Sequence, residues 1–352
     1  MALKNAGEID KNFLTSKIAR DGVIYYNADE FDVYGVKKID GLYRRMKYSD
    51  AILVSEKVAL ISSECAGGRV RFATDSPFIA ILVKYHSVAK VPNYSYTATM
   101  GFDLYSGKRY VGCFVPSMEA VESMEGVIDI DGEIEYREYT LNFPVCSEIC
   151  EVYVGVKKGC KIEKASAYSI KKPVVFYGSS TTQGACASRP GNTYENIISR
   201  ALDCDYLNLG FWGNARGEKT MAQYVSKLEM SAFVYDYDYN APSAEHLQST
   251  HEDMFKIIRK HNPQLPIVIL SAPRFYLNAD MDKRRRIVEQ TYENAVKAGD
   301  KCVRFISGRE MLNGVQETAL ADNIHPNDVG FVNMAKAVEK NLRELFNKGA
   351  RL

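Results

Sequence analysis

The C-terminal half of the sequence alternates between short apolar runs and longer stretches of helical character. A strand that is buried on both faces of a sheet has such an apolar run, and helices between successive runs indicate parallel strands. The apolar runs are residues 174–177, 206–209, 233–237, 267–270 and 303–306. The helical stretches lie near residues 193–202, 219–227, 244–260, 283–298 and 328–346. The alternation predicts an α/β domain in which helices cover both faces of a parallel sheet.

The N-terminal half has a different texture, because β-branched and aromatic runs alternate with turn residues at short intervals between about residues 31 and 170. The runs include residues 59–62, 70–73, 78–83 and 136–141. This pattern is typical of antiparallel strands in a β-sandwich or jelly roll. A chain of 352 residues also exceeds the usual size of one domain. We therefore predict a β-sandwich (jelly-roll-like) domain over residues 1–170 and an α/β domain over residues 171–352.

The charge of the chain is nearly balanced, with 45 basic and 44 acidic side chains and a formal net charge of +1. Such a chain has no long-range field that would attract nucleic acid or anionic membranes. The first residues carry charges where a secretory signal needs an apolar core, and no later stretch reaches the ~18 apolar residues of a spanning helix. We expect a cytoplasmic protein that binds neither nucleic acid nor membranes, and we leave homo-oligomer formation open.

The eight cysteines show no CxxC pair and no Cys/His cluster at the spacing of a zinc site. We therefore predict no metal site, and we interpret most of the cysteines as buried free thiols. Cys186 lies close in sequence to the serine-containing turn described next. Its small size suits the packing of a loop.

A glycine-flanked serine, Ser180, follows the first apolar run of the α/β domain, in the sequence Gly-Ser-Ser-Thr-Thr-Gln-Gly over residues 178–184. In an open α/β sheet, ligands bind at the carboxyl ends of the strands, so a serine at this point can face a crevice. The segment lacks the lysine of a P-loop and the spacing of the GxSxG elbow. Taken alone, it fits a loop or a phosphate cradle better than a nucleophile.

A serine nucleophile needs a base, and the sequence offers only five histidines: His86, His246, His251, His261 and His325. The first lies in the β-rich half. The next three share one polar helical stretch, where we expect a solvent-facing surface. The fifth is different because it directly precedes the last predicted helix.

His325 occurs in Asp-Asn-Ile-His-Pro-Asn over residues 322–327, and Asn327 can cap the helix that follows. An aspartate three residues before a histidine can fold back to accept its Nδ1–H. Asp322 would then fix the tautomer of His325 and leave Nε2 free to take a proton from Ser180. Two further segments, residues 208–215 and 235–242, follow predicted strands and carry glycine or asparagine that can donate to an oxyanion.

These four segments, in this order, resemble the sequence blocks of the SGNH hydrolases, the superfamily of the GDSL esterases and lipases. The resemblance implies that Ser180 is the nucleophile and that Asp322 and His325 form the family's DxxH pair. It implies Gly213, Asn240 and the backbone N–H of Ser180 as oxyanion donors. It also implies a flavodoxin-like three-layer α/β/α fold for this domain and a carboxylic ester hydrolase activity without a cofactor.

The first half carries Gly-Phe-Asp-Leu-Tyr over residues 101–105, which resembles the GxDLY segment of the β-rich domain that precedes SGNH modules in one bacterial subgroup. The second half departs from the family pattern at Ser179, where Asp is usual, and at Asp236 and Asp238, because many members have a glycine shortly before Asn240. The two aspartates can be interpreted as paired carboxylates for acid–base or metal chemistry. We favour hydrogen-bonding or surface roles, because the triad already supplies an acid–base pair.

The expected reaction is the hydrolysis of a short-chain acyl ester, with acetyl favoured, on a carbohydrate, through an acyl-enzyme. Trp212 can limit the acyl pocket, stack on a sugar ring or simply pack, and Arg189 can contact substrate or be structural. The polar side chains near the nucleophile argue against a groove for long acyl chains. The alternatives are a lipase or thioesterase for longer chains and a carbohydrate-binding protein without turnover.

Overall fold

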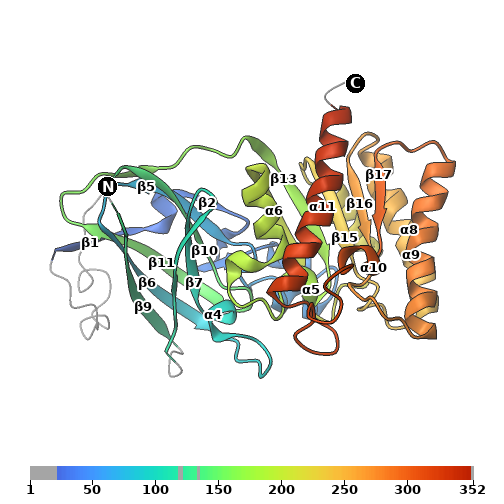
Figure 1. Cartoon of the computed structure of the whole chain (residues 1–352), viewed down its shortest axis with the longest axis horizontal. Helices are drawn as coiled ribbons and strands as arrows, with labels where there is room; N and C mark the ends of the chain where they lie inside the picture. Colours follow the sequence, from blue (N-terminus) through green and yellow to red (C-terminus); the bar gives the residue numbers. More distant parts are fainter. Residues whose placement is uncertain (1–21, 118–121, 133–134, 350–352) are drawn as a thin grey trace. The chain divides into compact units, whose positions relative to one another are not determined.

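The computed structural model of the chain describes residues 22–117, 122–132 and 135–349 (Figure 1). These residues form two compact units. The first contains the described residues of 1–45, 63–167 and 188–191, and the second those of 46–62, 168–187 and 192–352. The main change of unit along the chain therefore falls between residues 167 and 168. Two short segments, residues 46–62 and 188–191, belong to one unit although the residues before and after them in sequence belong to the other.

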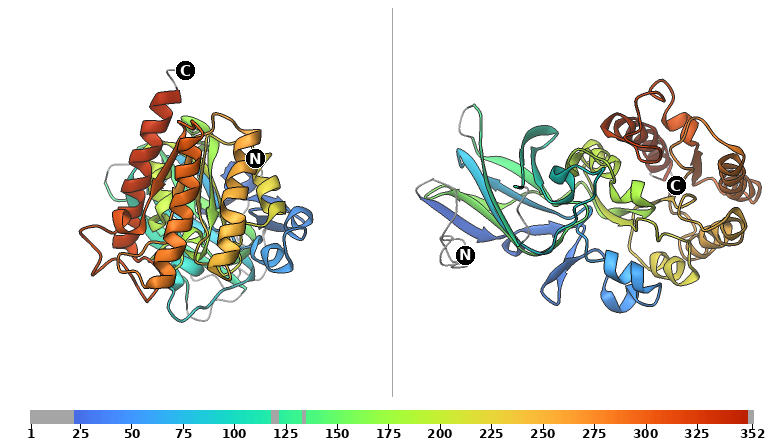
Figure 2. Two further views of the ribbon diagram at one scale, coloured as in Figure 1. Left: turned by 90° about the vertical axis from the view of Figure 1, so that its right-hand side faces the viewer. Right: turned by 90° about the horizontal axis from the view of Figure 1, so that it is seen from below.

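Two antiparallel sheets build the first unit (Figure 2). One has the order β1 (Val23–Asn27), β11 (Glu148–Lys157), β6 (Phe78–Ser87) and β9 (Ser123–Asp129). The other has the order β12 (Ile162–Lys164), β5 (Arg69–Thr74), β10 (Arg137–Asn142), β7 (Phe102–Ser106) and β8 (Arg109–Phe114), and β2 (Asp32–Tyr34) also pairs with β5. A hairpin of β3 (Lys37–Ile39) and β4 (Leu42–Arg44) and short helices η2 (Ala28–Glu30) and α4 (Tyr96–Thr99) complete this unit. Both sheets contribute to one apolar core, which makes the unit a β-sandwich.

The predicted strand at residues 59–62 is wrong, because this run lies in helix α3 (Glu56–Ile61). Ser55 caps the helix by accepting a hydrogen bond from the backbone N–H of Val58 at 3.1 Å. Val58 and Ile61 are buried while Leu60 is 61% exposed, which is helical rather than alternating spacing. Together with α2 (Tyr48–Ala51), this helix packs into the core of the second unit.

A five-stranded parallel sheet forms the centre of the second unit. Its order is β14 (Cys204–Gly210), β13 (Ile170–Gly178), β15 (Ala232–Asp236), β16 (Ile267–Leu270) and β17 (Val303–Ile306). The main helices are α6 (Tyr194–Leu202), α7 (Lys219–Ser226), α8 (Ala244–His261), α9 (Ala279–Lys297) and α11 (Asp328–Gly349). Two short helices are α5 (Ser180–Gln183) and α10 (Gly308–Met311). A third, η3 (Pro190–Asn192), lies across the change of unit, because residues 190–191 belong to the first unit.

The helices cover both faces of this sheet. Alternate side chains of β13 enter two separate cores: Val175 packs with apolar residues of α7, α8 and α9, and Val174 packs with those of α6 and α11. Figure 2 shows the sheet between these helices. The predicted α/β/α fold is confirmed, and β16 and β17 have the predicted bounds. All four residues of β16 are buried, as expected for a strand covered on both faces.

One histidine of α8 contradicts the predicted solvent-facing surface. His251 is only 1% exposed, and its ring stacks on Tyr235 of β15 and on Tyr237, which directly follows that strand. Its Nδ1 lies 2.8 Å from Oγ1 of Thr291 in α9. The helix turns this position toward the sheet, so the residue belongs to the core.

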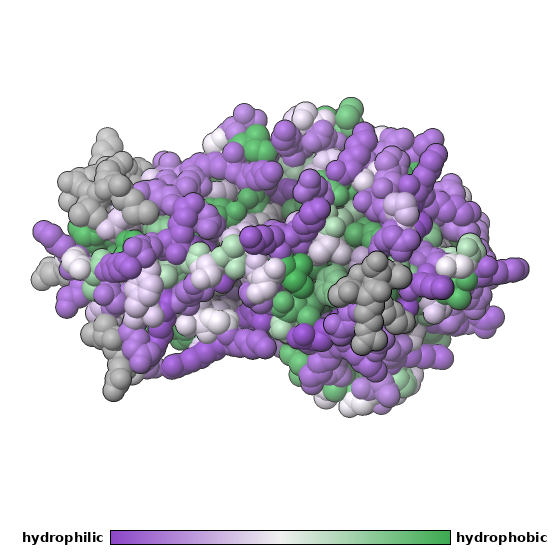
Figure 3. Space-filling view, turned by 90° about the horizontal axis from the view of Figure 1, so that it is seen from above, coloured by the Kyte–Doolittle hydropathy of each residue, from purple (hydrophilic) through white to green (hydrophobic). Residues whose placement is uncertain are grey.

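The visible surface is mostly hydrophilic, with scattered apolar areas, on the face that Figure 3 shows. Within the described residues, none of the helices combines the length and the apolar character needed to cross a membrane. The chain's eight cysteines are free thiols. Four of them are buried: Cys65, Cys146, Cys186 and Cys204.

Candidate active site

The serine-containing turn forms a short helix directly after the central strand β13. Ser179 caps helix α5 by accepting the backbone N–H of Thr181 at 3.2 Å, and Gly184 ends it with a left-handed φ of 104°. Ser180 is therefore the first helical residue. It is partly exposed, whereas the residues on both sides of it are buried. The fold thus presents this hydroxyl group at the carboxyl end of the sheet.

The expected base lies within hydrogen-bonding distance of this serine although 145 positions separate them in the chain. Oγ of Ser180 is 2.8 Å from Nε2 of His325, and Nδ1 of His325 is 2.8 Å from Oδ2 of Asp322. Oδ1 of Asp322 accepts the backbone N–H groups of Ile324 and His325 at 2.7 Å each. Donation of Nδ1–H to the carboxylate leaves Nε2 as the acceptor for the serine proton.

The environment keeps Asp322 ionised. Partial burial would raise its pKa, but the hydrogen bonds from His325 and Ile324 outweigh that effect and lower the pKa to about 2. Hydrogen bonds on both sides of Asp322 and His325 also hold the loop that carries them. Ala321 donates its N–H to the carbonyl oxygen of His325 at 2.9 Å, and Asn327 caps α11, as the sequence predicts, by accepting the N–H of Val329 at 2.9 Å.

The two other predicted donors lie on loops that follow the strands on either side of β13. Gly178 at the end of β13 pairs in register with Gly210 of β14 and with Asp236 of β15, so the three parallel strands end at one level. Gly213 follows β14 and has a left-handed φ of 69°. Asn240 follows β15, and its Oδ1 accepts the N–H of Ala215 at 3.3 Å, which leaves the amide nitrogen as the donor of that side chain.

The two residues that we considered for substrate contact have different surroundings. Trp212 is 48% exposed, and its backbone N–H donates to Oε1 of Gln183 at 3.2 Å. Arg189 belongs to the first unit, where its Nη1 lies 2.8 Å from Oδ2 of Asp103 and its guanidinium lies 4.0 Å from the ring centre of Tyr110. A substrate contact by either residue stays a prediction.

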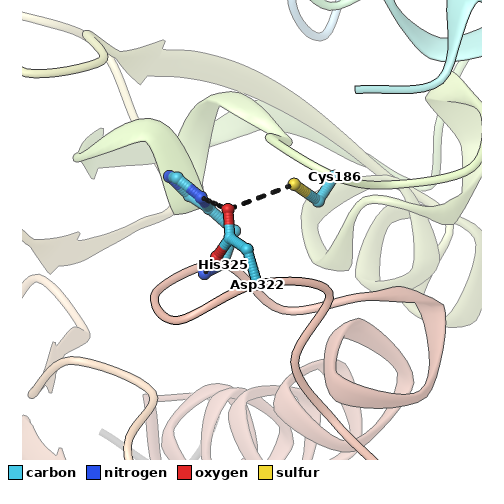
Figure 4. Close-up of side chains that lie close together, drawn as sticks. All are labelled: Cys186, Asp322 and His325. Atoms are coloured by element: carbon cyan, nitrogen blue, oxygen red, sulfur yellow. Dashed lines mark hydrogen bonds and ion pairs between the residues drawn. The ribbon is translucent and has the colours of Figure 1, made fainter. Parts of the chain in front are cut away.

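Cys186 approaches the carboxylate of the site, a contact that the sequence does not signal because 136 positions separate the two residues. Figure 4 shows its sulfur directed at Asp322, with a distance of 3.9 Å to Oδ2. Possible metal-binding atoms of Cys186, Asp322 and His325 lie within 4.8 Å of one another. Burial, with a contribution from Asp322, raises the pKa of this thiol to about 12, which disfavours the thiolate that a metal would need.

Comparison with known families agrees with this geometry. Residues 171–343 match the model of the GDSL-like lipase/acylhydrolase family. The α/β half of the chain belongs to this family. Residues 23–162 of this GDSL-like acylhydrolase match the model of the GxDLY domain, the N-terminus of SGNH hydrolase-type esterases. The predicted resemblance is confirmed in both halves, and the protein is a carboxylic ester hydrolase.

Solved structures share the fold of the acylhydrolase over most of its length. One, described as a GDSL-like lipase from Bacteroides ovatus, is 26% identical with a TM-score of 0.83, covering 93% of this chain and 98% of its own. A salicylyl-acyltransferase of a tetracycline biosynthetic pathway is 21% identical with a TM-score of 0.70, covering 93% and 96%. An acetyl xylan esterase from the rumen bacterium Butyrivibrio proteoclasticus is 14% identical with a TM-score of 0.61, covering 93% and 99%. No curated protein matches the chain in sequence.

Proposed function

We propose that this acylhydrolase cleaves short-chain acyl esters, with acetyl preferred, on a carbohydrate, and that Ser180, His325 and Asp322 are its catalytic triad. The observation that carries the proposal is the pair of consecutive 2.8 Å contacts from Ser180 to His325 and from His325 to Asp322. A hydroxyl, an imidazole and a carboxylate in this order can transfer a proton at neutral pH. The partial exposure of Ser180 gives a substrate access to the first member.

The reaction follows from this arrangement. Oγ of Ser180 attacks the ester carbonyl carbon while His325 takes the hydroxyl proton on Nε2, and the carbonyl π electrons move to the oxygen. The tetrahedral intermediate collapses, the bond to the alcohol breaks, and His325 returns its proton to the leaving oxygen. Water then repeats both steps on the acyl-enzyme and releases the acid. Asp322 stabilises the imidazolium that forms in each half of the cycle.

The oxyanion needs donors at the same place. We assign this role to the backbone N–H groups of Ser180 and Gly213 and to the side-chain amide of Asn240. Ser180 is at the N-terminus of a helical turn, and the other two follow the strands adjacent to β13. Loss of one such donor typically lowers kcat by about 10²–10³.

Three features support a short acyl group on a sugar. The half-exposed indole of Trp212 offers an apolar face that can stack on a sugar ring. Polar side chains surround the nucleophile turn, including Gln183, whose amide oxygen accepts the N–H of Trp212. A protein of the same fold is described as an acetyl xylan esterase.

The test is a chain-length series of p-nitrophenyl esters from acetate to octanoate, followed by acetate release from acetylated oligosaccharides. We expect the highest kcat/KM for acetate, and we expect Ser180→Ala to lower turnover by about 10³ or more. Ser249→Ala, at an exposed hydroxyl on α8, is the matched control and should match the wild type. Equal rates for Ser180→Ala and the wild type would refute the triad. Preference for eight carbons or more would replace the proposal by a lipase, and saccharide binding without turnover would indicate a binding protein.

A further inference from the structure

A buried carboxyl group lies beneath the nucleophile turn. Asp236 ends strand β15, is 2% exposed and does not reach the surface of the site. Its Oδ1 accepts the backbone N–H of Ser179 at 3.0 Å and the hydroxyl of Thr182 at 2.7 Å. Ser179 caps helix α5 directly before Ser180, and Thr182 lies in the helix two residues after it. One oxygen atom therefore holds the turn on both sides of the nucleophile.

The backbone packs closely around this contact. The N–H of Ser179 also approaches the carbonyl oxygen of Asp236 at 3.1 Å, so strand β15 holds the turn by main chain and side chain together. A Cβ atom on Gly178 would collide with Oδ1 of Asp236 and with Oγ1 of Thr182. The absence of a side chain at Gly178 therefore makes room for the carboxyl group of Asp236.

The surroundings of the second oxygen favour the neutral form of this carboxyl group. Oδ2 of Asp236 is buried and has no hydrogen-bond partner among the described residues. Burial, with a smaller contribution from the nearby Asp238, raises the pKa of Asp236 to about 7 although hydrogen bonds from Thr182 and Ser179 act in the opposite direction. Glu195 is also fully buried. Burial is the main cause of its raised pKa, and the nearby Asp236 raises the pKa as well. A protonated acid and a side-chain amide have the same acceptor oxygen, so an asparagine can replace the neutral form.

We propose that Asp236 is a positioning residue for the nucleophile: its Oδ1 fixes Ser179 and Thr182 and thereby keeps Oγ of Ser180 within bonding distance of His325. This inference rests on the proposed triad. Asp236 does not touch substrate or the reacting atoms, because its contacts are with residues on both sides of Ser180. The requirement is for an acceptor at Oδ1 and not for a negative charge.

Three variants test the proposal with an ester substrate at saturating and limiting concentrations. Asp236→Ala should lower kcat at least about tenfold, because a displacement of ~1 Å in a reacting group can cost 10² in rate, while KM stays within about twofold. Asp236→Asn should restore kcat to within about threefold of the wild type. Thr182→Val removes only the hydroxyl donor and should lower kcat by about three- to tenfold. Asp253→Ala, at an exposed aspartate on α8, is the control.

Active sites are counted by the phenol burst with a phosphonate ester, so that kcat refers to folded enzyme, and thermal melting checks each variant. Full kcat per active site in both Asp236→Ala and Thr182→Val would overturn the proposal. So would an equal loss in Asp236→Asn and Asp236→Ala, since that would assign the effect to charge or packing. If Ser180→Ala retains wild-type turnover, the triad fails. If Ser180→Ala is inactive while Asp236→Ala is fully active, only the positioning inference fails.

Discussion

Asp103, the aspartate of the GxDLY segment, forms a buried ion pair with Arg189. Its replacement tests how much this ion pair stabilises the first unit. Asp103 has a side-chain exposure of 0%, and its Oδ2 accepts Nη1 of Arg189 and the backbone N–H of Gly191 at 2.8 Å each. Oδ1 accepts the amide of Asn142 at 2.8 Å. The change Asp103→Asn keeps the shape of the side chain and removes its charge.

The expected cost follows from the burial of this pair. Removing one charge of a buried ion pair costs about 3–5 kcal/mol, because the other charge stays without compensation. Arg189 retains 19% side-chain exposure, so solvent screens part of its charge. We therefore expect the lower end of that range, about 3 kcal/mol. With a urea dependence of about 2 kcal/mol per molar, the unfolding midpoint should fall by about 1.5 M.

The assay is urea unfolding followed by circular dichroism, with an exposed pair of the same unit as the control. Lys164 and Asp32 are also 2.8 Å apart, but their side chains are 58% and 35% exposed. Such a pair contributes less than about 1 kcal/mol, so Asp32→Asn should shift the midpoint by less than about 0.5 M. A shift for Asp103→Asn no larger than that for Asp32→Asn would refute the argument from burial.

Two further predictions concern groups whose pKa is displaced by burial. The pKa of Cys186 is raised to about 12, so this thiol should resist iodoacetamide at pH 7.5 in the folded protein and react after denaturation; stoichiometric labelling of the folded protein in peptide mass spectrometry would contradict this. Burial lowers the pKa of His251 to about 3, so the folded state keeps it neutral while the unfolded state protonates it below pH 6.5. Its contribution to stability is therefore complete above pH 6.5 and decreases toward pH 3, by up to about 5 kcal/mol, and His251→Phe should flatten this dependence in urea titrations between pH 7 and 4. An unchanged slope in the variant would contradict the assignment.

Local sequence signals predict the second unit well, because its strands are short apolar runs and its helices carry recognisable caps. They fail where a short apolar run fits either structure, as in α3, whose Ser55 cap is the missed signal. They also fail for His251, because its burial depends on Tyr235 of β15, on Tyr237 directly after that strand and on Thr291 of α9. Such contacts are not visible from the polarity of a helix alone.

Some contacts of the candidate site can also be predicted from local sequence, and others cannot. The spacing of Asp322 and His325 allows their contact to be predicted, because three residues permit the loop to fold back. The support beneath the nucleophile from Asp236 and the approach of Cys186 join segments 57 and 136 positions apart, respectively, and no local pattern marks them. Resemblance to the GxDLY segment locates Asp103, but its ionic partner Arg189 emerges only from the three-dimensional structure.

The crossing of short segments between the two units affects how such a protein can evolve. Residues 46–62 precede most of the β-sandwich in sequence, yet Met46, Val58 and Ile61 complete an apolar core of the α/β unit. Residues 188–191 interrupt the α/β sequence but belong to the first unit, where Arg189 and Gly191 donate hydrogen bonds to Asp103. A recombination event at residue 170 would therefore separate each half from part of its own interior. The two halves are expected to be inherited and exchanged together as one genetic module.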